Sequence, residues 1–203
     1  MLGRRSLISG AIAALATPAA AETPGERLAR AARAQVGVTR DYDPNYVRIG
    51  YPGGDVPRAT GVCADVVIRA ARDGLGLDLQ KLVHEDMAHA FAAYPSKRAW
   101  GMDRPDANID HRRVLNLETF WRRQGCETWR AWKDVAGHAF PRPMAVGDLL
   151  TWRVAGNRPH VGVVTATEPL VRVTHNIGWG VQEVLLETFV PFRAIGHYRW
   201  PRA

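Results

Sequence analysis

The sequence predicts an α+β domain, because helical patterns occupy its first two thirds and short β-rich runs occupy the rest. Between Glu22 and Gln124, apolar residues recur at intervals of three and four, the spacing of one helix face. From Pro143 onward, runs rich in Val, Ile, Thr and aromatic residues are divided by Gly, Pro and Asn. Helices followed by a meander of strands are typical of an α+β fold with a small antiparallel sheet.

The length and composition are those of one globular domain. The chain has 203 residues, enough for a single core. Its formal net charge of +7 suggests anionic partners, such as cell-wall polymer or a membrane surface. The basic residues are scattered rather than gathered into an arm, so we expect no nucleic-acid partner.

Residues 1–21 are typical of a secretory signal peptide. Arg4 and Arg5 precede the apolar run Leu7–Ala16, and Ala19-Ala20-Ala21 supplies small residues for cleavage before Glu22. The apolar run is too short to span a membrane, and no other long apolar stretch follows. We therefore expect one mature domain over residues 22–203 that is periplasmic or secreted and not an integral membrane protein. The sequence RRSLI at residues 4–8 resembles a twin-arginine export signal.

The stretch Tyr51–Ala71 is the centre of the predicted fold. A loop rich in Pro and Gly leads into a helix that begins at Cys63 and ends near Asp73-Gly74. The apolar residues after Cys63 recur at helical spacing, which places this cysteine in the first turn, on the side that faces the core. Unpaired amides and the positive end of the helix dipole favour a thiolate there, so Cys63 is a candidate nucleophile.

The other helices are expected before and after this one along the chain. Apolar residues at helical spacing predict helices over residues 22–35, 78–94 and 117–124. The polar stretch Trp100–Asn116 has no clear period and predicts an ordered loop, and Trp129–Phe140 favours no single structure. Strands are expected at Asp148–Val154, His160–Ala166, Leu170–Asn176, Val181–Leu186 and Ile195–Trp200.

Two histidines lie where neighbouring predicted strands begin and end. His160 opens one strand, and His175 closes the next, where it shares a face with Val171 and Val173. If these strands pair as a hairpin, the imidazoles come close together. His160 is then a base for Cys63, and His175 orients its ring, which is the nucleophile, base and orienting group of a catalytic triad.

The cysteines and histidines also fit structural roles. Cys63 and Cys126 in an exported chain suit a structural disulfide. Cys63, His160 and His175 suit a three-ligand zinc site, although the chain has no His-Glu-x-x-His or Cys-x-x-Cys spacing to support it. A single histidine at a strand end is more often structural than catalytic. We expect neither a metal nor another cofactor.

The sequence resembles the NlpC-like branch of the papain-like cysteine peptidases, and more closely a family of secreted bacterial proteins assigned to that superfamily as a domain of unknown function. The resemblance covers residues 51–176. Its motifs are Tyr51 with Gly53-Gly54, the cysteine motif at residues 61–65, Gly147-Asp148-Leu149, His160-Val161-Gly162-Val163 and His175.

The resemblance implies a papain-like α+β fold that cleaves amide bonds in peptidoglycan stem peptides. It implies Cys63 as nucleophile, His160 as base and His175 as orienting residue, with Tyr51 and Asp65 near the substrate. Val62 and Ala64 replace polar neighbours of the family cysteine. Residues 78–140 are longer than the family core needs, so we expect a helical and loop insertion there.

Charged and aromatic residues outside the triad are further candidates for binding substrate. Asp110 and Arg112 in the polar loop suit a charged substrate, because arginine grips carboxylates with two hydrogen bonds. An internal ion-pair network that holds the loop would use the same two residues equally well. Trp179 follows His175 in a Gly-rich turn and is expected to line a cleft.

Two functions follow from these residues. The first is an exported thiol hydrolase acting on peptidoglycan or another peptide. The second is a non-catalytic module on the same fold that binds the cell wall or an envelope partner, with Cys63 idle or bonded to Cys126.

Overall fold

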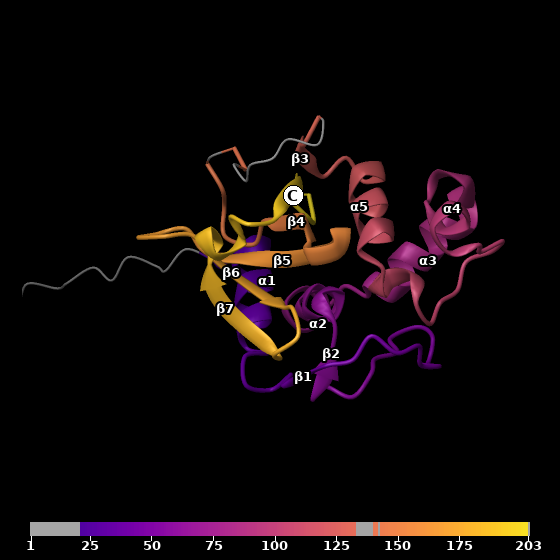
Figure 1. The fold of residues 1–203 in the computed structure, drawn as a ribbon. Helices are drawn as coiled ribbons and strands as arrows, with labels where there is room; N and C mark the ends of the chain where they lie inside the picture. The colour runs from indigo at the N-terminus through magenta and orange to yellow at the C-terminus, as the bar shows by residue number, and fades with distance from the viewer. Residues whose placement is uncertain (1–20, 133–139, 142, 203) are drawn as a thin grey trace, which may run out of the picture.

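The computed structural model describes residues 21–132, 140–141 and 143–202. The expected signal peptide therefore lies outside the described residues, apart from Ala21. Helices pack against a six-stranded antiparallel sheet, so the predicted α+β class is confirmed (Figure 1). Among the described residues, no helix has the length and apolar character needed to cross a bilayer.

The described residues form five α-helices and four short 3₁₀ helices. The α-helices are α1 (Pro24–Arg33), α2 (Cys63–Leu75), α3 (Leu79–Ala90), α4 (Ser96–Trp100) and α5 (Val114–Arg123). The 3₁₀ helices are η1 (Phe91–Ala93), η2 (Asp110–Arg112), η3 (Ala155–Asn157) and η4 (Leu186–Phe189).

The large sheet has the strand order β3-β8-β4-β5-β6-β7. Its strands are β3 (Glu127–Arg130), β4 (Leu149–Val154), β5 (Arg158–Ala166), β6 (Arg172–Asn176), β7 (Val181–Leu185) and β8 (Arg193–Tyr198). A small parallel pair, β1 (Asp41–Tyr42) and β2 (Thr60–Gly61), precedes α2.

Two hydrophobic cores cover the two faces of the sheet. The first joins α1, α2, α3 and α5 to the strand residues Leu149, Val161 and Val163. The second packs Trp152, Val164 and other strand residues against η4, Phe140 and Met144. Strand alternation explains the division, because neighbouring residues of β5 point to opposite faces.

The structure differs from expectation at α5 and β3, and it adds the short helix α4, which the sequence did not predict. Helix α5 begins at Val114, inside the expected loop, because the buried side chains of Val114, Leu117 and Trp121 already follow helical spacing. Residues Glu127–Arg130, expected within the insertion, form strand β3 and pair with β8 at the sheet edge. A strand this short shows too few alternations to stand out in the sequence. The rest of Trp129–Phe140 falls largely outside the described residues.

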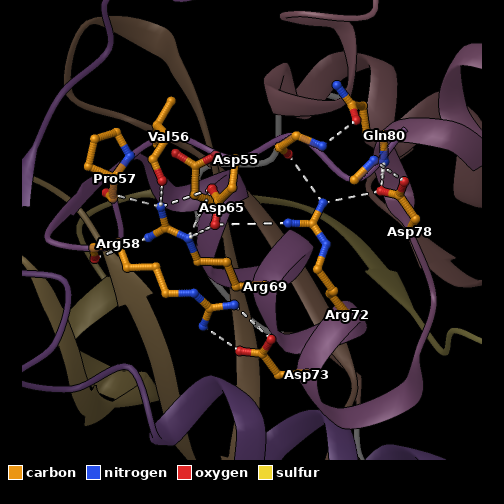
Figure 2. A network of polar contacts seen from close by, with 12 residues as sticks. Asp55, Val56, Pro57, Arg58, Asp65, Arg69, Arg72, Asp73, Asp78 and Gln80 are labelled. Atoms are coloured by element: carbon orange, nitrogen blue, oxygen red, sulfur yellow. Dashed lines mark hydrogen bonds and ion pairs between the residues drawn. The ribbon is translucent and has the colours of Figure 1, made fainter. Parts of the chain in front are cut away.

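A network of charged residues holds the Gly- and Pro-rich loop against α2 (Figure 2). The buried Arg69 guanidinium donates to the Asp55 carboxylate at 2.9 Å and to the Val56 carbonyl at 3.1 Å. Arg72 on the next turn donates to Asp78 at 3.2 Å, and Gln80 accepts from the amide of Gly54 at 2.9 Å. These contacts fix the chain that enters α2 at Cys63.

Candidate active site

Cys63 occupies the first turn of α2, as the sequence predicts. Its side chain is 4% exposed. The N-terminus of the helix is held by Asp65, whose carboxylate accepts the backbone N–H of Val62 at 2.6 Å. An acidic side chain in the first turn of a helix satisfies a free amide and complements the helix dipole. Asp65 therefore fixes the helix end that presents Cys63.

Two opposing effects set the acidity of the Cys63 thiol. Burial raises its pKa to about 11, and the Asp65 carboxylate adds to this rise. Backbone amides of Val161, Ala64 and Cys63 itself hydrogen-bond the sulfur and oppose it. The helix tip alone predicts a stabilised thiolate. This expectation is wrong for the free protein, because burial disfavours the charged thiolate more than the three backbone amides stabilise it.

His160 and His175 come together as the hairpin prediction requires. Strands β5 and β6 are antiparallel neighbours, and His160 Nε2 lies 3.2 Å from His175 Nδ1. Gly162 makes room for the pair, since a Cβ there would overlap the Val173 side chain and lie 3.4 Å from His175 Cβ. Phe189 stacks on the His160 ring, with centroids 5.7 Å apart and planes at 24°.

Both imidazoles are neutral near pH 7. Burial lowers the pKa of His160 well below its usual value, the neighbouring His175 lowers it further, and burial lowers the pKa of His175 to about 4. In their hydrogen bond, one ring nitrogen donates and the other accepts. If His160 Nε2 donates, its Nδ1 carries a free lone pair and is a base. The tautomer of this pair therefore decides whether His160 can receive a proton.

The thiol and the histidine pair approach the same end of β5 from different sides. Val161, whose amide meets the Cys63 sulfur, directly follows His160. The Val161 side chain belongs to the helix-covered core, whereas His160 packs beside Trp152 and Phe189 on the other face. Within the described residues, no hydrogen bond joins Cys63 to either imidazole. The structure thus brings His160 and His175 together but leaves Cys63 without an imidazole partner among the described residues.

A cavity of about 390 Å³ lies over Cys63. Its walls come from the start of α2, the segment around β1, the end of α4, η2, the start of α5 and the start of β5. The residues that line it are Tyr42, Pro44, Tyr46, Val62, Cys63, Trp100, Ile109, Arg112, Arg113, Val114, Leu115 and Pro159. An elongated ligand can therefore reach the thiol from the surface.

Tyr42 is a residue of this site that the sequence did not single out. It lines the cavity with Cys63, and burial, followed by the charge of Cys63, raises the pKa of its phenol to about 12. The phenol is therefore a hydrogen-bond donor at neutral pH. Tyr42 is one of several tyrosines in a turn-rich segment, and nothing in that segment distinguishes it.

Asp65 and Arg112, both expected to bind substrate, instead bind each other. Arg112 Nε and Nη2 donate to the two Asp65 carboxylate oxygens at 2.9 and 2.8 Å. The Arg112 and Asp65 side chains are 3% and 4% exposed, respectively. Asp110 is also buried, where it accepts from the Asp106 amide at 2.6 Å and from Arg113 at 3.1 Å. These contacts form the internal ion-pair network that the sequence also allows for this loop.

Tyr51 and Trp179 lie away from the cavity over Cys63. Tyr51 makes an edge contact with His84, with ring centroids 4.9 Å apart. Trp179 is 81% exposed on the turn after β6. Neither residue lines the cavity, so their predicted roles in substrate binding stay predictions.

The comparisons with known proteins place the chain in a family whose domain has no assigned function. The family described as domain of unknown function DUF1287 matches residues 29–200. This chain belongs to the DUF1287 family. It is also similar to the protein printed as "Uncharacterized protein YijF" of Escherichia coli (strain K12), with 48% identity over 176 residues, which cover 85% of this chain and 80% of the relative.

Two alternatives for the cysteines of this DUF1287 protein can be compared with the structure. Cys63 and Cys126 are both free and buried, so the structure contains no disulfide between them. Over residues 21–132, 140–141 and 143–202, no group of three His, Cys, Asp or Glu side chains converges in a way that could hold a metal ion. The three-ligand zinc interpretation therefore gains no support.

Buried neutral histidines predict that this DUF1287 domain loses stability in mild acid. Burial lowers the pKa of His111 and His175 to about 4, whereas histidine in an unfolded chain titrates near pH ~6.5. Between these values the unfolded state binds more protons, so the free energy of unfolding falls as the pH falls from about 6.5 to about 4. Urea unfolding at pH 7.5, 6, 5 and 4.5 measures this slope.

The replacement His111→Gln should reduce that slope, and His89→Gln on the surface serves as its matched control. A free energy of unfolding that stays constant from pH 7.5 to 4.5 would contradict buried neutral histidines.

Proposed function

We propose that this protein is an exported thiol hydrolase of the NlpC type that cleaves an amide bond, with peptidoglycan stem peptides as its substrates. The observation that carries the proposal is the neutral His160–His175 pair, whose Nε2 and Nδ1 atoms are 3.2 Å apart. His160 directly precedes Val161, whose backbone amide hydrogen-bonds the Cys63 sulfur. The open cavity over Cys63 supports it, because a peptide can reach the thiol there. Export through the predicted signal peptide would place the enzyme at its substrate.

The proposed reaction begins when substrate fills the cavity and the Cys63 thiol passes its proton to His160. The sulfur then attacks the amide carbonyl, the C–N bond breaks, and the imidazolium of His160 protonates the leaving amine. Water, with His160 as base, hydrolyses the thioester and restores the thiol. His175 accepts a hydrogen bond from His160 Nε2 and so stabilises the imidazolium.

Two groups near the thiol suit the negative oxygen that forms during attack. The backbone amide of Cys63 lies in the first turn of α2, next to the sulfur that attacks the carbonyl. The phenol of Tyr42 is the second group. Tyr42 lines the cavity and Tyr51 does not, so we assign to Tyr42 the role near the substrate that the resemblance implies for Tyr51. Cys63 and His160 lie on opposite faces of β5 in the free protein, and His160 does not line the cavity over Cys63, so the proposed proton transfer requires the start of β5 to rearrange when substrate binds.

A non-catalytic binding module is the second candidate, and one observation favours it. The pKa of Cys63 is raised to about 11 and the thiol has no imidazole partner among the described residues, so nothing activates it in the free protein. On this alternative, the same cavity would hold a cell-wall or envelope peptide without cleaving it.

Incubation of the purified mature protein with peptidoglycan, followed by separation of the soluble products, distinguishes the two functions. New amine termini and released stem peptides indicate a hydrolase. Binding to the polymer without any product, over a range of pH, indicates a binding module.

We predict that variants of the two histidines differ in their rates of hydrolysis in that assay. His160→Ala should remove turnover, since Val161, Gly162 and Val163 provide no other base on this strand. His175→Asn should keep measurable turnover because an amide oxygen can accept the hydrogen bond from His160, whereas His175→Ala should lose at least about tenfold more. Asn176→Ala is the neighbouring control, because the Asn176 side chain donates to Gly61 O at 3.0 Å rather than to His160. Equal rates for His160→Ala and the unaltered protein would contradict the proposed base.

A further inference from the structure

A second cavity adjoins the one over Cys63. It has a volume of about 560 Å³ and lies between the segments 46–49 and 102–108. Its lining residues are Tyr46, Arg48, Ile49, Met102, Arg104, Pro105, Asp106, Ala107 and Asn108. Tyr46 lines both cavities, so a ligand that reaches Cys63 can extend past this side chain into the second cavity.

The two segments are fastened to each other by polar contacts. The Ile49 amide donates to Asn108 Oδ1 at 3.0 Å, and the Tyr46 hydroxyl donates to Asp106 Oδ2 at 3.1 Å. The Asn108 side-chain amide donates to the Tyr46 hydroxyl at 3.0 Å. These contacts preform the cavity, which reduces the entropy lost when a ligand binds.

The charged groups in this cavity favour an anion. Arg48 and Arg104 are exposed, and neither forms an ion pair with any described residue. The only carboxylate in the lining belongs to Asp106, and it already accepts from the Asn108 amide at 2.9 Å and from the Tyr46 hydroxyl at 3.1 Å. The cavity therefore has two guanidinium groups, of Arg48 and Arg104, without an ion-pair partner among the described residues. Its one carboxylate, of Asp106, already accepts hydrogen bonds from neighbouring groups.

We propose that this cavity is a subsite for a carboxylate of the substrate, and that Arg48 and Arg104 determine specificity for anionic peptides. Guanidinium groups bind carboxylates with paired hydrogen bonds, which gives orientation as well as affinity. The inference rests on the proposed function, since it names the substrate class of the same site. Such a subsite selects peptides that carry a free carboxylate in addition to the amide bond at Cys63.

Peptide binding to a variant that cannot hydrolyse its substrate can be measured separately from catalysis. The probe is a stem tetrapeptide with free carboxyl groups, compared with the same peptide carrying carboxamides, and each is titrated calorimetrically into the Cys63→Ala protein. The free acid should bind about tenfold more tightly, a difference of about 1.4 kcal/mol. In the double variant Arg48→Gln/Arg104→Gln that difference should disappear, because neither residue can then pair with a carboxylate.

Arg27→Gln is the matched control, since Arg27 is an exposed arginine on α1 outside both cavities, and it should keep the tenfold preference. The subsite is overturned if the preference survives in the double variant, or if neither peptide binds. Peptidoglycan hydrolysis by the unaltered protein is measured separately. A carboxylate preference without hydrolysis contradicts the proposed function alone, and hydrolysis without the preference contradicts the subsite alone.

Discussion

Replacement of Cys63 by Ala is expected to abolish amide hydrolysis while the protein stays folded. A hydrolase that loses its nucleophile loses at least about 10³-fold in rate, because the remaining groups only bind and polarise the substrate. Alanine keeps the helix at this position and removes one buried sulfur atom, so the loss of stability should be small. The rate is measured on peptidoglycan, and the fold is measured by thermal unfolding.

Cys126→Ala is the matched control for this variant. Cys126 is also free and buried, but it does not line the cavity over Cys63. It should therefore retain the rate of the unaltered protein. If Cys63→Ala cleaves peptidoglycan normally, the thiol is not the nucleophile. If Cys63→Ala unfolds at a much lower temperature than Cys126→Ala, the main role of Cys63 is packing.

Replacement of Arg112 by Met is expected to cause the largest loss of stability among the variants considered. The Asp65–Arg112 pair is 4% and 3% exposed, so Arg112→Met leaves a carboxylate buried without its partner. Breaking a buried ion pair in this way costs about 3–5 kcal/mol. Denaturant unfolding at pH 7 measures the change, and the melting temperature should fall by about 10 °C.

Two further variants test whether the unpaired charge is the cause. Arg30→Met breaks the exposed Arg30–Glu22 pair, whose side chains are 64% and 39% exposed, and should cost less than about 1 kcal/mol. Asp65→Asn combined with Arg112→Met removes the stranded charge and should recover part of the loss. A change below about 1 kcal/mol for Arg112→Met alone would mean that Arg112 is not needed for the fold. It would then be available to the ligand of the cavity over Cys63.

The sequence by itself determined the elements that carry the candidate site. Helical spacing after Cys63 placed that residue at the start of α2, where the structure has it. Strand alternation and the turn between two β-rich runs placed His160 and His175 on paired strands, and their rings lie together. These features depend on the spacing of neighbouring residues along the chain, which a sequence records directly.

Only the tertiary structure decided which residues meet across the molecule. Asp65 and Arg112 are 47 residues apart in sequence and form a buried pair, so the loop that carries Arg112 holds α2 in place instead of offering a free cation. Tyr42 rather than Tyr51 lines the cavity over Cys63, although both tyrosines lie in turn-rich sequence. No local pattern distinguishes between such partners.

The protonation of the site also depends on tertiary structure. The helix tip predicts an acidic thiol, but burial raises the pKa of Cys63 to about 11 and lowers the pKa of His175 to about 4. Helix amides act over one turn and can be inferred from the sequence, whereas desolvation comes from every element packed around the group. The sequence therefore determined which groups are present in the site, and the packing of the helices and the sheet decided which of them carry charge.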